Sequence, residues 1–406
     1  MIRFPKSFYW GAATSSYQVE GGNANADWWA WEKKAGKENS GPACRHYELY
    51  EQDFDLVQDL NHNAHRLSIE WSRIEPQEGQ FSEEAIDHYS RVLVALRARG
   101  IEPMVTLHHF TNPLWFAKSG GWTDPKCIKR FLRYCDFAVR ALARRVNFWF
   151  TINEPTVYFS HSYFWGVWPP QERSLSRMIK VHHHMNQAHI EAYGLIHHIY
   201  KEYNLLSPSV SIAQHMQAIV ACDKGLRNRV AASLREYLYN LEVLDHLTKH
   251  KALDFIGVNY YSRHLVHAHS WAIGDLLGEV CRDDHHPLER NSLGWAVYPE
   301  GLLQVLLNVK KYHLPVLIAE NGICTADDDQ RWRFIQSHLK NIHMSMEQGV
   351  DVFGYLYWAL LDNFEWAEGF KPRFGLIDVD YTTQQRTVRE SAKKFGQVCH
   401  TGILEE

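Results

Sequence analysis

The sequence predicts a (β/α)8 barrel that forms a single domain over residues 1–406. Eight short apolar segments recur along the chain, and segments with helical periodicity lie between them. Several of the eight are continuous apolar runs, which is typical of parallel strands buried on both faces. No low-complexity linker or repeat interrupts the chain, and α/β barrels of this length occur as one domain.

Each expected strand is short, and polar residues lie at or near the end of most of them. The expected strands occupy residues 8–14, 64–71, 102–109, 148–153, 209–215, 254–261, 316–321 and 353–359. Between the second and third strands, Ser82 is expected to cap a helix that ends at Gly100. Between the third and fourth strands, Asp124 is expected to cap a helix, with Pro125 at its first position. Strand and helix therefore alternate as a barrel requires.

Composition excludes several classes of function. The net charge of −4 provides no basic surface for nucleic acid. No stretch approaches the ~18 consecutive apolar residues of a membrane span, and the first residues lack the pattern of a signal peptide. The seven cysteines are odd in number and include no CxxC pair. We therefore expect reduced thiols and a cytoplasmic location, and we make no prediction of oligomeric state.

Polar side chains gather where the expected strands end. They are Gln18, Glu20, Arg66, Glu70, His108, His109, Asn153, Glu154, Asn259, Tyr260, Tyr261, Glu320, Asn321 and Trp358. Active sites of (β/α)8 barrels lie at this end of the strands. Polar groups that close apolar strands cost desolvation energy unless they are paired. This distribution predicts a polar pocket at the mouth of the barrel.

Two glutamates stand out among these residues. Glu154 follows the fourth strand and Glu320 ends the seventh, and each lies beside an asparagine. Two carboxyl groups opposed across a pocket suit glycoside hydrolysis, where one enters the reaction protonated and the other ionised. A single glutamate at a strand end is more often a salt-bridged rim residue. Two of them, on different strands, favour a catalytic pair.

Several segments resemble glycoside hydrolase family 1, the β-glucosidase and β-galactosidase family, over nearly the whole chain. TINEP (151–155) and ENG (320–322) resemble its signature pair. Further similar segments are FYWGAATSSYQVEGG, HRLSIEWSRIEP, MVTLHHFTNPLW, GVNYYS and YWALLDNFEWAEGFKPRFGLIDVDY. The resemblance implies a (β/α)8 fold, a retaining mechanism, and no cofactor or metal.

The resemblance also implies the catalytic roles. Glu154 would be the general acid/base and Glu320 the nucleophile. Arg66 would keep Glu320 ionised, and Tyr261 would donate a hydrogen bond to it. The charge of Glu320 and a dry pocket would raise the pKa of Glu154, which would fall once Glu320 is glycosylated. Asn153 would bind the 2-hydroxyl of the sugar.

The family also implies a sugar-binding set and a substrate class. Gln18, His109, Glu365 and Trp366 would hold the hydroxyls, Trp358 would stack beneath the ring, and Phe374 would close one wall. The expected substrate is a β-linked glucoside or oligosaccharide with a terminal non-reducing β-D-glucosyl residue, and also a β-D-galactosyl or fucosyl residue. Both gluco and galacto epimers remain open.

The sequence departs from the family pattern in three places. Ala319 precedes Glu320 where threonine or serine is common, and Phe110 follows His109 where many members have tryptophan. The region between the fifth and sixth strands is short for the family. A shorter wall there predicts a more open mouth that tolerates bulky aglycones.

Other interpretations were weighed against this one. A non-catalytic glycan-binding relative is disfavoured because both carboxylates are present, and a thioglucosidase because Glu154 is present. A 6-phospho-β-glycosidase is disfavoured because Glu365 would repel a phosphate. The histidines at 182–184, 189, 197 and 198 could suggest a metal, but they read as a solvated helix face. The acidic residues 327–329 read as a capped surface turn.

Overall fold

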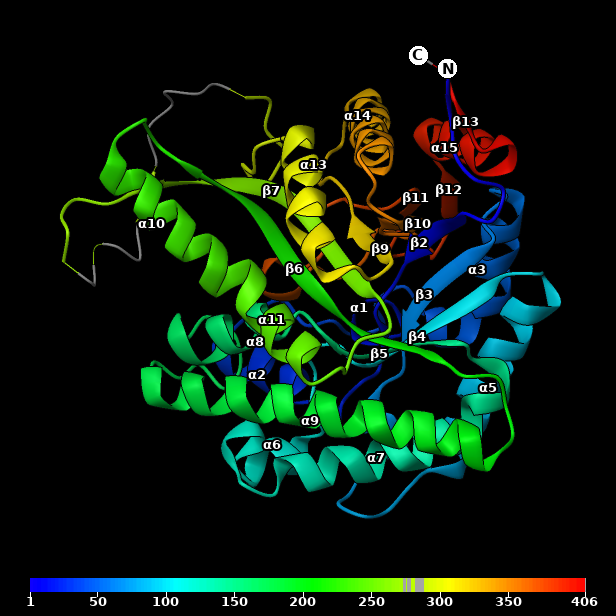
Figure 1. The fold of residues 1–406 in the computed structure, drawn as a ribbon. Coiled ribbons are helices and arrows are strands. Elements are labelled where there is room, and N and C mark those ends of the chain that lie inside the picture. The colour runs from blue at the N-terminus through cyan, green and yellow to red at the C-terminus, as the bar shows by residue number, and fades with distance from the viewer. Residues whose placement is uncertain (273–274, 276–278, 282–287, 406) are drawn as a thin grey trace.

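Eight parallel strands close into a barrel, as the sequence predicts (Figure 1). A computed structural model describes residues 1–272, 275, 279–281 and 288–405. The barrel strands, in order around the barrel, are β2 (Tyr9–Ala13), β3 (Ala64–Ser68), β4 (Glu102–His108), β5 (Phe148–Asn153), β6 (Ser209–Ala221), β7 (Ile256–His267), β9 (Val316–Asn321) and β10 (Val352–Trp358). Pairing of β10 with β2 closes the cylinder.

Two of the strands are longer than predicted. β6 has 13 residues and β7 has 12, and both run past the rim of the barrel. Beyond the rim they pair with each other from Ala218 and Arg263 onward, and β8 (Glu279–Val280) joins β7 in antiparallel fashion. Figure 1 shows this extension projecting from the barrel beside α10 (Leu226–Glu236). Extended strands thus stand at the place where the sequence led us to expect only a shortened wall.

Helices cover the outside of the barrel. Besides α10 they are α1 (Ser16–Val19), α2 (Asp27–Ala35), α3 (His46–Asp59), α4 (Trp71–Ile74), α5 (Glu83–Ala98), α6 (Leu114–Lys118), α7 (Cys127–Leu142), α8 (Pro155–Phe159), α9 (Leu175–Glu202), α11 (Glu242–Lys249), α13 (Pro299–Val309), α14 (Asp328–Glu347) and α15 (Glu390–Thr401). Short 3₁₀ or π turns occupy Gly121–Thr123, Ala143–Arg145, Ser160–Phe164, Tyr237–Leu241, Lys310–Tyr312 and Trp366–Glu368. None of the helices in the described ranges is long and apolar enough to cross a bilayer.

The predicted helix caps are partly correct. Ser82 accepts a hydrogen bond from the backbone of Ala85 and caps α5, and Gly100 follows this helix with a positive φ of 71°. α7 begins at Cys127, two residues later than the predicted start. The side chain of Asp124 accepts from the backbone N–H of Lys126 at 2.8 Å. It therefore holds the turn that precedes the helix rather than the helix itself.

Two small sheets complete the fold. β1 (Ile2–Arg3) pairs with β13 (Ile403–Leu404), which brings the two ends of the chain together (Figure 1). β11 (Ile377–Val379) pairs with β12 (Arg386–Val388) close to the mouth of the barrel.

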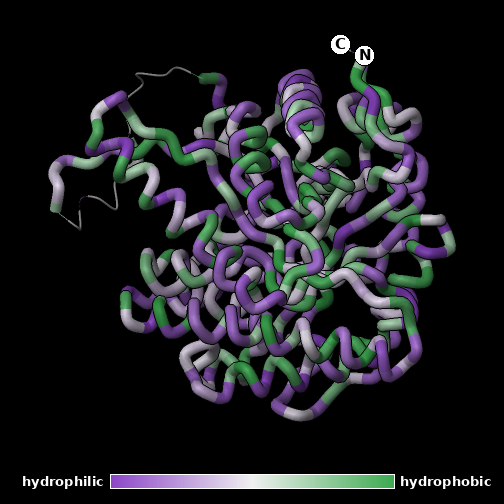
Figure 2. Tube along the Cα trace, viewed as in Figure 1, coloured by the Kyte–Doolittle hydropathy of each residue, from purple (hydrophilic) through white to green (hydrophobic). Residues whose placement is uncertain are grey.

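Most of the buried apolar residues of the barrel belong to two separate layers. The larger layer lies between the strands and the helices, and the smaller one fills the inside of the barrel. The inner layer consists of Ala64, Met104, Phe150, Ala213, Phe255, Leu317, Ala319 and Leu356. Figure 2 shows hydrophobic segments concentrated in the interior, with hydrophilic ones outside. The barrel is therefore a packed core beneath its mouth, not a channel.

The cysteines differ in part from expectation. Cys222, just after β6, and Cys281, just after β8, form a disulfide, so the expectation of uniformly reduced thiols is wrong at this pair. Both β6 and β8 pair with β7 at Val266, next to which the two cysteines lie. The other five cysteines are free and buried.

Candidate active site

Glu154 leaves its strand through an abrupt change of backbone direction. β5 ends at Asn153, and Glu154 adopts the left-handed conformation with φ 43° and ψ 60°. Pro155 then occupies the first turn of α8, where its missing N–H costs nothing. A non-glycine residue in this conformation persists only where its surroundings hold it, and such residues cluster at functional sites. Here the backbone N–H of Glu154 donates to the carbonyl of Ala213 at 2.7 Å.

Both glutamates are preceded by a shift in strand register. Between β5 and β6 the register shifts between Phe150 and Asn153, and between β7 and β9 it shifts just before Glu320. An extra residue in one strand bends it and re-aims the side chains that follow. These two irregularities turn the carboxyl groups from opposite walls toward one mouth.

The glycine after Glu320 is required by close packing. A Cβ on Gly322 would lie 1.8 Å from the carbonyl oxygen of Trp358. The backbone of β9 can therefore pass the end of β10 only if this residue has no side chain. This contact explains why glycine follows Glu320 and Asn321.

Glu320 is buried and held by two donors. Its Oε1 accepts from the Arg66 guanidinium at 2.5 Å, and its Oε2 accepts from the Tyr261 hydroxyl at 2.6 Å. Arg66 is itself 1% exposed and is fixed by the Thr106 hydroxyl at 3.1 Å. A buried ion pair of this kind is held in one geometry because both partners have further hydrogen bonds.

Glu154 is buried and contacts a different donor. Its Oε1 accepts from the side-chain amide of Asn259 at 2.8 Å. In the neighbouring strand Glu320 is the register partner of Asn259, so this residue stands between the two carboxyl groups. Asn259 is fully buried on β7.

Asn153 connects these groups to the sugar pocket. Its Oδ1 accepts from Arg66 at 2.6 Å and from Asn259 at 3.2 Å. Its amide nitrogen lies 3.1 Å from Nε2 of His109. Because the amide donates, Nε2 accepts, and the ring proton of His109 lies on Nδ1. Nδ1 has no hydrogen-bond partner among the described residues and is left as a donor.

The two carboxyl groups differ in acidity. Burial, and then the charge of Glu320, raise the pKa of Glu154 well above its ordinary value. Burial also raises the pKa of Glu320, but Arg66 and Tyr261 oppose that effect. The pKa of Glu320 is therefore not held at or below its ordinary value, although Arg66 acts on it in the expected direction. At neutral pH this difference favours a proton on Glu154 and a charge on Glu320.

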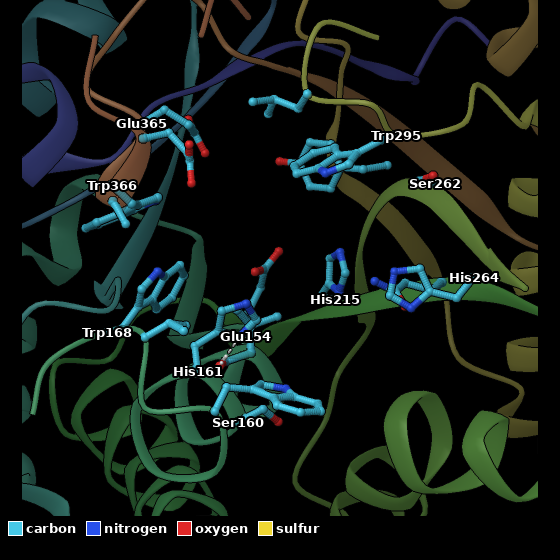
Figure 3. A pocket seen from close by; sticks show the side chains of 18 of the residues that line it. Glu154, Ser160, His161, Trp168, His215, Ser262, His264, Trp295, Glu365 and Trp366 are labelled. Carbon is cyan, nitrogen blue, oxygen red and sulfur yellow. Dashed lines mark hydrogen bonds between the residues drawn. The ribbon is translucent and has the colours of Figure 1, made fainter. Parts of the chain in front are cut away.

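The remaining predicted residues line the same cavity, which has a volume of about 960 Å³ (Figure 3). The cavity is lined by His109, Glu154, Tyr261, Glu320, Trp358, Glu365, Trp366 and Phe374. Gln18 lies just behind it and donates to Glu365 at 3.2 Å. Burial, and then the charge of Glu320, raise the pKa of Glu365 to about 8.

Aromatic rings build the walls of this cavity. The ring of His109 stacks with Trp358 at 5.9 Å and with Trp366 at 6.0 Å between centroids. On the opposite side, Phe374 packs against Tyr261 and against Trp295. Figure 3 shows Trp366 and Glu365 facing Trp295 across the open space, with Glu154 between them below. Flat apolar walls with a few polar groups between them suit a sugar ring.

Asn259 was expected at the mouth of the barrel, but the sequence indicated no role for it. Asn259 was among the polar residues at the strand ends, and the structure places its amide between Glu154 and Asn153. The signal was present in the motif GVNYYS, where asparagine directly precedes two tyrosines. His215, from the longer β6, also lines the cavity and stacks on Tyr261. No sequence pattern indicated that contact.

The helical histidines and the acidic residues 327–329, which could have suggested metal sites, have different surroundings. The helical histidines lie on α9, but several are paired rather than solvated: His189 contacts Thr151, and His197 contacts Asp254. No group of three or more potential metal ligands occurs in the described part of the chain. Asp327 caps α14 by accepting from two backbone N–H groups, as expected for a capped turn.

A closed (β/α)8 barrel with two opposed buried carboxyl groups in an aromatic mouth defines a glycoside hydrolase type of site. The family model for glycosyl hydrolase family 1 matches residues 1–248 and 227–402. The chain therefore belongs to glycosyl hydrolase family 1, and the prediction of a β-glucosidase-type O-glycoside hydrolase is confirmed at the level of enzyme class.

Individual relatives agree with this assignment. The chain is 30% identical to Beta-glucosidase A of Thermotoga maritima, over all of this chain and 99% of that protein. It is 29% identical to the 6-phospho-beta-glucosidase GmuD of Bacillus subtilis, over 99% and 98% of the two chains. Among solved structures, a beta-glycosidase from Pyrococcus horikoshii matches with a TM-score of 0.93 and 39% identity, over 100% and 96% of the chains. The beta-glucosidase from Thermotoga maritima in complex with glucoimidazole matches with a TM-score of 0.91 and 28% identity, over 99% and 100%.

Proposed function

We propose that the protein is a retaining β-glycosidase that removes terminal non-reducing β-D-glucosyl residues, and also β-D-galactosyl or fucosyl residues, from β-linked glucosides and oligosaccharides. Glu154 is the general acid/base and Glu320 the nucleophile. The relatives named β-glucosidase and β-glycosidase support the substrate class. The cytoplasmic location expected from the sequence stays part of this proposal.

The observation that carries the retaining mechanism is the closeness of the two buried carboxyl groups on either side of Asn259. Asn259 donates to Glu154 at 2.8 Å and is the register partner of Glu320 on the neighbouring strand. After burial, the charge of Glu320 is the largest influence that raises the pKa of Glu154. Retaining enzymes place their carboxyl groups about 5–5.5 Å apart, whereas inverting enzymes need about 6.5–9.5 Å to admit a water. This closeness therefore favours direct attack by Glu320.

The reaction follows from the acidity difference. In the first step a Glu320 oxygen attacks the anomeric carbon, the glycosidic C–O bond breaks, and the leaving oxygen takes the proton of Glu154. The charge on Glu320 is then lost in the ester bond, so the pKa of Glu154 falls. In the second step Glu154 takes a proton from water, the water oxygen attacks the anomeric carbon, and Glu320 leaves as a carboxylate.

The sugar itself is bound by neutral donors and aromatic walls. The free Nδ1 donor of His109 and the Glu365 carboxyl group, held by Gln18, offer hydrogen bonds to ring hydroxyls. Asn153 is the expected partner of the 2-hydroxyl. Trp358 supports the ring from below, with Trp366 and Phe374 on the walls.

The 6-phospho-β-glycosidase alternative is disfavoured by charge, although one relative carries that name. A phosphate group in this pocket would approach the ionised Glu320, and Glu365, whose pKa is raised to about 8, offers it no positive charge. Repulsion between like charges in a buried site is strong because water does not screen it. Neutral glycosides are therefore the preferred substrates.

Kinetics on a panel of nitrophenyl glycosides with Glu154→Gln and Glu320→Gln tests the proposal. The Glu320 variant should lose at least about 10⁴-fold in kcat on every substrate. For the Glu154 variant, kcat/KM, which reports the first step, should fall far less on dinitrophenyl glycosides, whose leaving groups need no proton, than on alkyl glycosides or cellobiose. The first product should keep the β configuration by NMR. Inversion, or equal losses of the Glu154 variant on all substrates, would overturn the assignment.

A further inference from the structure

Asn259 sits in a position to act on both catalytic carboxyl groups. On the barrel wall it pairs with His215 of β6 on one side and with Glu320 of β9 on the other. Its side chain is completely buried, and its Nδ2 lies 2.8 Å from Oε1 of Glu154 and 3.2 Å from Oδ1 of Asn153. A buried amide in this place has few ways to turn, because strands pack against it on both sides.

The orientation of this amide is fixed by a chain of donors that begins at Arg66. A guanidinium can only donate, so the Asn153 atom that faces Arg66 at 2.6 Å is its oxygen. That oxygen also faces Asn259, which must therefore present its nitrogen. The same nitrogen faces Glu154. The ion pair of the nucleophile thus determines which end of Asn259 meets the acid.

A donor at Oε1 restricts where Glu154 can carry its proton. A neutral carboxyl group holds one hydrogen, on one of its two oxygens. The carbonyl oxygen of a neutral carboxyl group is a better acceptor than its hydroxyl oxygen, so the N–H of Asn259 at Oε1 favours the proton on Oε2. We propose that Asn259 is a positioning residue that reserves Oε1 of Glu154 as an acceptor and thereby directs the catalytic proton to Oε2.

This inference rests on the proposed function and adds one specification to it. In the first step Oε2 gives its proton to the leaving oxygen as the glycosidic bond breaks and Glu320 bonds to the anomeric carbon. In the second step Oε2 accepts the proton from the attacking water as the bond to Glu320 breaks. Asn259 keeps its hydrogen bond to Oε1 throughout, and that bond strengthens when Glu154 becomes an anion.

The other groups around Glu154 do not supply this donor. The charged and titratable groups facing it are Glu320 on β9, Arg66 on β3, Glu365 before the Trp366–Glu368 turn, Tyr261 on β7 and Tyr239 in the Tyr237–Leu241 turn. Of these, Arg66 and Tyr261 donate to Glu320. The hydroxyl of Tyr239 lies 2.8 Å from Nδ1 of His215. Among the described residues, Asn259 is thus the side-chain donor to Glu154.

The test compares Asn259→Leu, which has a similar shape and no donor, with the wild-type enzyme on two substrates. We expect kcat/KM for an alkyl glucoside or cellobiose to fall roughly 10- to 100-fold, the value of one charge-assisted hydrogen bond. On 2,4-dinitrophenyl glucoside, where no acid is needed, the first step should change by less than about threefold. The alkaline limb of the pH profile should move up by about one pH unit, since the ionised form of Glu154 loses its donor.

Two further variants separate this role from a structural one. Asn259→Asp has nearly the same shape, replaces the donor by an acceptor, and should lose more than the leucine variant on the alkyl substrate. Asn259→Asp also provides the test if the leucine variant does not fold. Gln214→Met removes a buried amide from β6 that contacts Thr156 and Tyr239 rather than either catalytic glutamate. It should leave the pH profile and the substrate ratio unchanged.

The outcomes are distinguishable from failure of the proposed function. Equal losses of Asn259→Leu on both substrates, with an unmoved alkaline limb, would overturn the positioning role while leaving Glu154 as the acid. Loss of the leaving-group dependence in Glu154→Gln would instead overturn the proposed function itself.

Discussion

The inside of the barrel and its mouth are built from the same strands but have opposite chemistry. Leu317 of β9 is one of the eight apolar residues of the inner layer, while Glu320, three residues further along, is also buried but among charges and amides. The two regions meet where the guanidinium of Arg66 lies 4.7 Å from the centroid of the Phe150 ring. Burial of the inner layer stabilises the fold, whereas burial of the carboxyl groups at the mouth costs desolvation energy. Stability and reactivity are therefore separated along each strand.

The largest effect comes from changing one residue on each side of this boundary. Glu320→Gln should lower kcat by a factor of at least about 10⁴. It should leave the free energy of unfolding near or above the wild-type value. Leu317→Ala should lower that free energy by about 2–5 kcal/mol, since it opens a cavity in a packed core. Its kcat should stay within about threefold at temperatures where it is folded.

Denaturant unfolding and steady-state kinetics on the same samples check this pair. If kcat of Leu317→Ala fell by much more than about threefold while the variant was still folded, the two regions would be coupled rather than separate.

The next effect concerns the acid side of the pH profile. Burial raises the pKa of Glu320, and the charge of Arg66 opposes this effect without cancelling it. Replacing Arg66 by methionine should raise that pKa further, so the acid limb of kcat/KM should move to higher pH by about 1–3 pH units. The rate at the optimum should also fall, because Asn153 loses one of its two donors.

Arg66→Lys keeps the positive charge but not the fork of donors. Its acid limb should therefore lie between those of the wild-type enzyme and the methionine variant. An acid limb that stays in place in both variants would mean that a group other than Glu320 controls it.

A smaller effect should appear in stability at alkaline pH. The pKa of Glu365 is raised from 4.5 to about 8. Between these values the folded protein binds more protons than the unfolded chain, so this group's stabilisation is fully present below pH 4.5 and is lost as pH rises through 8. Glu365→Gln should therefore raise Tm by about 2–5 °C at pH 8.5 and by less at pH 5.

The same variant should bind glucosides more weakly, seen as an increased KM. Calorimetric melts at the two pH values, with wild-type enzyme alongside, measure the difference. A gain in Tm of equal size at pH 5 and pH 8.5 would show that ionisation of Glu365 is not its cause.

The apolar side of the boundary could be read from the sequence more fully than the polar side. All eight strands follow from apolar runs, and β5 and β9 have the predicted bounds, because burial on both faces leaves a continuous signal. The positions of Glu154 and Glu320 at strand ends were equally legible. The register shifts that aim them were not, since a bulge depends on how neighbouring strands pair. The extension of β6 and β7 beyond the rim depends on long-range pairing in the same way.

The smallest effect tests the boundary at the residue next to the nucleophile. Ala319 differs from the serine or threonine common in the family, and its side chain belongs to the apolar layer inside the barrel. Ala319→Ser should lower the free energy of unfolding by about 1–2 kcal/mol, because the hydroxyl enters a site lined by apolar groups. It should change kcat/KM by less than about twofold, since Arg66 and Tyr261 already hold both oxygens of Glu320. Ala319→Val, which adds volume without polarity, separates the cost of the hydroxyl from that of crowding. A several-fold rise in kcat/KM for the serine variant alone would place Ala319 within reach of the nucleophile, and the polar mouth would then begin one residue deeper than the packing indicates.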